Sequence, residues 1–132
     1  MRNKTVLTLD DAQRVLAAAL EKAAQKHWAV SIAIMDDGAN LLSFARMDGA
    51  KLGSVTTAIE KARTAVLFER PTKGLEEIIA SGRNAMLNLP HSVPIQGGLP
   101  LIHETTIVGA IGVSGVTSPE DEEVARAGAA AL

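Results

Sequence analysis

The residues best suited to bind an anion lie near the middle of the chain. Arg46 and Asp48 stand at the end of a predicted strand, and Lys61 lies on the helix predicted to follow it. Arg46 and Lys61 could together hold a carboxylate, with Asp48 orienting one of the two cations. Alternatively, the three side chains form an ion-pair network that pins the strand to the helix. Lys61 flanks the apolar stripe of its helix, so we expect it to be partly enclosed.

The three histidines of the chain are candidate iron ligands or proton carriers. His91 is the strongest candidate, because it lies in a long loop between Pro90 and Pro94. His103 and Glu104 fall in a predicted hairpin turn, where they form an acid–base pair if they face a cleft and are solvated otherwise. For each histidine the common alternative is a position at the surface or the edge of the core. Further candidate ligands of a haem iron are the interior methionines Met35, Met47 and Met86.

Two other segments have both a chemical and a structural interpretation. Gly97 and Gly98 could present backbone N–H groups to an anion, or could make a tight turn into a strand. The acidic run 120–123 could bind a cation, but four carboxylates at a helix start are better explained by the helix dipole. Glu122 in this run is a candidate proton carrier. No glycine-rich loop leads directly into a helix, which argues against a P-loop or a Rossmann site.

The composition limits the class of protein. With 132 residues, 47% of them hydrophobic, the chain fits one compact domain, residues 1–132. A net charge of −2 and 2% aromatic residues argue against nucleic-acid binding. The absence of cysteine excludes disulfides and thiolate metal sites, and it is compatible with a reducing cytoplasm. We expect no metal site. No secretion signal or membrane-spanning run is apparent, and we expect a cytoplasmic homo-oligomer without membrane partners.

Hydrophobic periodicity and breaker residues predict an α+β layout, one sheet with helices packed against it. The predicted helices are 8–26 with Thr8 as N-cap, 55–68 with Ser54 as N-cap, a short helix from Thr72, and a last helix capped by Ser118 with Asp121 completing the capping box. The predicted strands are 29–36, 40–46, 97–102 and 107–115. Residues 83–98 form a long irregular loop, which in a compact domain is more often functional than idle.

The strand at 107–115 has one bulky face and one almost bare face. Because strand side chains alternate, Ile107 and Ile111 should share the bulky face, and Ala110 and Gly112 the bare one. A bare strand face indicates close approach of another element. We expect the last helix, with its own small residues, to pack there. A ligand site would then lie at the rim, where the long loop and Gly97-Gly98 meet Arg46, Asp48 and Lys61.

Several of these segments together resemble the GlcG/HbpS-like family, which includes the C-terminal domain of PduO-type adenosyltransferases. The segments are 35–38, 46–50 with Ser54, 61–65, 94–101, 108–115, and Asp121-Glu122 with Ala127-Gly128. Their order and spacing match the family from about residue 8 to the end. The resemblance implies a single profilin-like domain, with an antiparallel five-stranded sheet flanked by helices, and frequently a homo-oligomer.

The resemblance leaves more than one function open. It implies a small-molecule-binding protein of this family, with haem as a possible cofactor or ligand; Arg46 and Lys61 suggest a small organic acid. The predicted ligand-binding residues are Arg46, Asp48, Lys61, His91, Gly97 and Gly98. The alternative is an enzyme, a hydrolase, tautomerase or similar catalyst, acting on a carboxylate intermediate of a catabolic pathway. Its predicted catalytic residues are Lys61, His91, Glu104 and Glu122. A purely structural accessory subunit is the third hypothesis.

Overall fold

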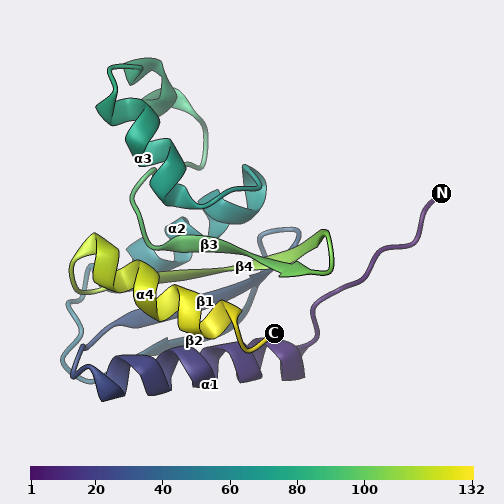
Figure 1. The fold of residues 1–132 in the computed structure, drawn as a ribbon, viewed down its shortest axis with the longest axis vertical. Helices are drawn as coiled ribbons and strands as arrows, with labels where there is room; N and C mark the ends of the chain where they lie inside the picture. Colours follow the sequence, from purple (N-terminus) through teal and green to yellow (C-terminus); the bar gives the residue numbers. More distant parts are fainter.

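The computed structural model describes all residues, 1–132, and contains four α-helices, one 3₁₀-helix and one four-stranded sheet. The strand order is β2-β1-β4-β3, and every pair of neighbouring strands is antiparallel. Figure 1 shows the arrangement. The helices are α1 (Leu9–Gln25), α2 (Ser54–Leu67), α3 (Thr72–Ala80), η1 (Asn84–Asn88) and α4 (Ser118–Ala129). The strands are β1 (Ser31–Asp36), β2 (Leu41–Arg46), β3 (Gly98–His103) and β4 (Thr106–Ser114).

The predicted α+β layout and antiparallel sheet are confirmed, but the predicted number of five strands is wrong. The sheet has four strands, as the residue pattern predicts, and the fifth strand that the resemblance implied is absent. The chain before β3 bonds to a helix instead. The N–H of Val93 donates to the Thr64 hydroxyl on α2 at 2.8 Å. Pro94 has no N–H to give to a ladder. The loop therefore runs along α2 and enters the sheet only at Gly98.

The sheet is covered on both faces, and the two faces differ in the size of their side chains. Helices α1 and α4 lie together on one face, where large aliphatic residues such as Ile32, Ile34 and Ile111 form the larger core cluster (Figure 1). Helix α2 covers the other face, and most of that smaller cluster is alanine. Small side chains let the backbone of α2 approach the strands closely.

The bare face of β4 packs against α2, so the prediction that the last helix covers it is wrong. A Cβ on Gly112 would overlap the Ala58 carbonyl oxygen of α2 and lie 2.5 Å from the Ala62 nitrogen. The alternation of β4 is also interrupted by a bulge: Leu101 pairs with Gly109, and the next residue of β3 pairs with Ile107. Val108 is the extra residue, and so Ile107 faces α2 while Ile111 faces the other core.

Helix α1 begins as predicted, with a capping box between Thr8 and Asp11. The box of α4 lies one residue earlier than predicted, between Thr117 and Glu120. Asp121 is thereby free to point into the fold. The predicted cap Ser54 is also wrong: its hydroxyl donates to the Lys51 carbonyl at 2.5 Å, and α2 has no side-chain cap.

Two segments extend from the layered body. Helices α3 and η1 form a lobe that projects from the body in Figure 1, and η1 contains no buried residue. The N-terminal segment runs past the tip of the β3–β4 hairpin (Figure 1), and Leu7 anchors it in the core. None of the helices combines the length and the apolar composition that crossing a membrane would require.

Candidate functional site

Lys61 is the most deeply enclosed ionisable residue of the predicted site. Its side chain is 2% exposed, and its ammonium donates to Asp121 Oδ2 and to the Val113 carbonyl, both at 3.0 Å. The predicted enclosure of Lys61 is confirmed. The predicted ionic partner of Lys61 is wrong, however, because Lys61 pairs with Asp121 of α4 and not with Asp48. The earlier capping box of α4 is the reason, since it turns Asp121 inward.

The buried carboxylate of Asp121 joins three elements. One oxygen accepts from Lys61, and the other accepts from the Val116 N–H at 3.1 Å. Burial raises the pKa of Asp121 above its ordinary value, although the charge of Lys61 opposes that rise. We call Lys61, Asp121 and the Val113 carbonyl the buried junction. Removing either charge would leave the other buried without a partner.

The Gly97-Gly98 pair closes the buried junction from the loop side. Gly97 has a φ of +134°, and a Cβ there would lie 2.8 Å from the Lys61 ammonium nitrogen. The Gly98 N–H donates to the Thr72 hydroxyl at 2.9 Å, and the Gly97 carbonyl accepts from the Val113 N–H at 3.0 Å. This geometry fits the tight-turn interpretation, because the Gly98 N–H is already engaged within the protein.

Glu122 lies next to the junction and is held from two sides. Its Oε2 accepts from the Gln96 amide at 3.1 Å and from Arg126 at 2.8 Å. The residue is buried, as Asp121 is, whereas Glu120 and Glu123 on either side of this pair are half-buried. Asp121 and Glu122 together fasten the loop before β3 to the first turns of α4. The structure thus brings Lys61, Gly97, Gly98 and Glu122 into one region.

The other predicted residues lie apart from this region. Arg46 and Asp48 are exposed, and neither makes a side-chain hydrogen bond or an ion pair. The predicted network of Arg46, Asp48 and Lys61 is therefore wrong. His91 is exposed in the loop after η1, with a positive φ of 56°. Glu104 is exposed at the hairpin turn, 4.0 Å from His103.

Two cavities lie beside the N-terminal segment, and neither contains the buried junction. The larger, about 520 Å³, is mostly polar and lies between residues 2–5, the hairpin turn and the end of α2. The smaller, about 250 Å³, lies between the N-terminal segment, α1 and the β3–β4 hairpin. We call the smaller one the Arg14 pocket; its lining is Thr5, Val6, Leu7, Asp11, Arg14, His103, Val108 and Leu132.

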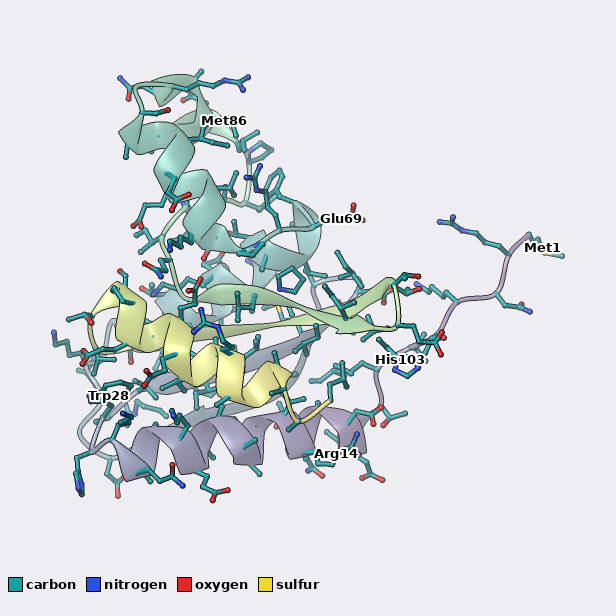
Figure 2. All side chains as sticks on the ribbon, viewed as in Figure 1. Met1, Arg14, Trp28, Glu69, Met86 and His103 are labelled. Carbon is teal, nitrogen blue, oxygen red and sulfur yellow. The ribbon has the colours of Figure 1, made fainter.

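Arg14 was missed by reasoning from the sequence, and His103 was only partly recognised. Figure 2 shows Arg14 near the start of α1 and His103 on the hairpin, at the same end of the molecule. His103 lines the Arg14 pocket, so it faces a cleft as its acid–base hypothesis requires, but Glu104 does not line it. The signal for Arg14 was its spacing of three residues from Asp11, which places both on one helix face.

No three histidine, aspartate or glutamate side chains gather closely enough to hold a metal ion. The chemistry that the geometry offers is therefore of two kinds: a sealed charge pair at the buried junction, and an open arginine with a histidine beside a small, half-apolar cavity. Of these two, only the arginine and histidine leave hydrogen-bond donors facing a space that a ligand can enter.

Comparison with known proteins places the whole chain in one group. Residues 7–130 match the family model described as haem degrading protein HbpS-like. Protein GlcG of Escherichia coli K12 is 42% identical over 114 residues, covering 86% of this chain and 85% of that protein. A crystal structure of an HbpS double mutant from Streptomyces reticuli superposes with a TM-score of 0.92 at 36% identity, covering 100% of this chain and 90% of that one.

A crystal structure of a PduOC–haem complex has a TM-score of 0.87 at 28% identity, covering 97% of this chain and 96% of that one. These matches cover nearly the full chain and include both sides of the sheet. They confirm the resemblance that the glycine-containing strand segments and the Asp121-Glu122 pair had indicated. The chain belongs to the HbpS-like family.

Proposed function

We propose that this protein binds haem or another small molecule. The observation that carries the proposal is the similarity over almost the whole chain to HbpS and to the PduOC domain, whose crystal structure contains haem. The family description names haem degradation, which adds support for haem as the ligand class. The small-acid version is supported by the exposed, unpaired guanidinium of Arg46.

The haem version is tested by titrating the protein with haemin and recording the Soret band. We expect a shifted band with saturation, because a protein ligand to the iron changes its electronic structure. His91→Ala should reduce the shift, and His27→Ala is the matched control, since both histidines are exposed and both have a positive φ. A Soret band identical to that of free haemin would reject haem. A shift that survives His91→Ala would reject His91 as the ligand.

Assembly into a homo-oligomer in the cytoplasm belongs to the same proposal. The lobe of α3 and η1 exposes large apolar side chains that a monomer leaves in water, among them Leu87, which is 60% exposed, and Ile95, which follows on the loop. Light scattering during size-exclusion chromatography tests the assembly. A mass of one 13.8 kDa chain at micromolar concentration would reject it.

An enzyme acting on a carboxylate is the alternative, and a specific observation favours it. Lys61, Asp121 and Glu122 form a buried group of ionisable side chains, and burial raises the pKa of Asp121. Such groups accompany active sites as well as structural ion pairs. In this version Lys61 and Glu122 would serve substrate binding and proton transfer, and the other two predicted catalytic residues, His91 and Glu104, lie exposed and apart from them. Turnover of a carboxylate substrate that survives both Lys61→Ala and His91→Ala would reject this assignment.

A further inference from the structure

We infer that the Arg14 pocket is a binding site for the carboxylate of a small molecule with a short apolar body. The inference rests on the proposed small-molecule function and names a site and a ligand class for it. Its basis is a cavity of about 250 Å³ that has a guanidinium at one wall and aliphatic side chains at the others.

Arg14 is held in place by one ion pair, which leaves most of its N–H donors free. Its Nη2 donates to Asp11 Oδ1 at 2.9 Å, and the other oxygen of Asp11 accepts from the Thr8 N–H at 3.0 Å and the Thr8 hydroxyl at 2.7 Å. These bonds to Thr8 lower the pKa of Asp11, so the carboxylate stays charged and keeps the guanidinium oriented. An arginine has five N–H donors, and no other acceptor engages Arg14. Its remaining donors can therefore bind a ligand carboxylate in a fork.

The rest of the lining suits a short hydrocarbon. Leu7 and Val108 are buried, and Leu132 and Val6 complete the apolar part of the wall. The N-terminal segment is fixed here by Leu7, whose side chain packs so close to the strand that a Cβ on Gly109 would lie 3.2 Å from it. His103 adds a polar ring to the lining.

The volume restricts the ligand. A cavity of about 250 Å³ is smaller than the roughly 300–1,000 Å³ of sites that enclose drug-sized molecules. A complete porphyrin does not fit, whereas a carboxylic acid of a few carbons does. The carboxylate that binds Arg14 could nevertheless belong to either of two ligands: a free small acid, or the propionate arm of a haem whose ring stays outside the pocket. Both present a carboxylate on a short alkyl chain to Arg14.

The test measures binding of acetate, butyrate and butyramide to the full chain by NMR titration, following the Arg14 side-chain N–H and the Val108 methyl groups. We expect butyrate to bind at least tenfold more tightly than butyramide, since only the acid has the charge. We expect about fourfold tighter binding for each CH₂ added between acetate and butyrate. Arg14→Gln should weaken butyrate binding at least tenfold, and Arg14→Lys should weaken it less, because lysine keeps the charge but loses the fork.

Arg83→Gln is the matched control, an exposed arginine between α3 and η1 and outside the pocket, and should leave butyrate binding unchanged. Equal binding of acid and amide, or a butyrate affinity that Arg14→Gln leaves unaltered, would overturn the inference. Haemin titrated in parallel separates the two sources: a haemin affinity lowered by Arg14→Gln, with no free acid binding, assigns the site to a propionate. A Soret shift independent of Arg14, with no acid bound, overturns this inference and leaves the proposed function standing. If neither haemin nor any acid binds, both fail.

Discussion

The buried junction and the Arg14 pocket each contain a cation paired with an aspartate, yet the two pairs do opposite things. At the junction the side chains of Lys61 and Asp121 are 2% and 3% exposed, and the remaining capacity of Asp121 is taken by a backbone N–H. At the pocket the side chains of Arg14 and Asp11 are 57% and 28% exposed. The difference shows that residue type alone does not mark a ligand site. A charged residue can bind a ligand only if some of its hydrogen-bond donors remain free and face a cavity.

The two pairs should also differ in whether they affect folding stability or ligand binding. A buried pair contributes little net stability over an apolar pair of the same size, but leaving one partner alone is costly. An exposed pair contributes little to folding, so its arginine can be changed without loss of the fold. Substitutions at the junction should therefore act on folding, and substitutions at the pocket on ligand affinity. Four experiments test this division.

Lys61→Met should have the largest effect. It leaves the Asp121 carboxylate buried beside an apolar chain, and we expect the free energy of unfolding to fall by about 3–5 kcal/mol at pH 7. Urea denaturation monitored by circular dichroism measures the change. The double variant Lys61→Met with Asp121→Asn should lose less, because it removes both charges. A single-variant loss below about 1 kcal/mol would mean that the junction is open to water.

Gly98→Ala should cause the second-largest loss of stability. A Cβ there would overlap the Lys61 carbonyl oxygen and lie 2.8 Å from Thr72 Cγ2. Because a helix backbone cannot move aside, we expect a loss at the upper end of the roughly 1–3 kcal/mol typical of overpacking. Gly53→Ala is the control, since no atom lies within 4 Å of its Cβ, and it should change stability by less than about 1 kcal/mol. Equal effects in thermal or urea unfolding would contradict the close approach of loop and helix.

The pKa values of Asp11 and Asp121 should be shifted in opposite directions from the ordinary value of 3.8. The pKa of Asp11 is lowered, so its contribution to stability is present above 3.8 and lost as the pH falls through its folded pKa. The pKa of Asp121 is raised, so stability instead falls as the pH rises from 3.8 through its folded pKa. Carboxyl-detected NMR titration measures both values. Midpoints in the reverse order would overturn the description of the two regions.

Arg46→Ala should have the smallest effect on folding. The side chain is exposed and has no ionic partner, so we expect a change below about 0.5 kcal/mol in the free energy of unfolding. The same urea denaturation measures it, with Lys61→Met as the reference of large effect. A loss above about 1 kcal/mol would show that Arg46 has a structural partner, as the network hypothesis from the sequence required.

Much of the fold could be predicted from local sequence features. The Thr8–Asp11 capping box, the breakers around residues 83–98 and the alternation of the strands depend on neighbours in the chain, and the structure follows them. The count of five strands came from the resemblance, whereas the residue pattern predicts the four that are present. The loop before β3 stays outside the sheet, where Val93 bonds to Thr64, which lies 29 residues away in the sequence. The helix that covers the bare face of β4 was predicted wrongly, because tertiary packing decides the side of the sheet on which each helix lies; the bulge only moved Ile107 away from the face of Ile111.

The sequence by itself determined the family, the α+β class and the presence of charged residues able to bind an anion. Only the tertiary structure decided which charges are neutralised. Lys61 and Asp121 are 60 residues apart, and their pairing depends on how α2, β4 and α4 pack. Arg14 and His103 likewise meet one cavity only because the hairpin and α1 lie at the same end of the molecule. Partners distant in the chain leave no local pattern, because the free energy that joins them comes from burial and packing of the whole fold.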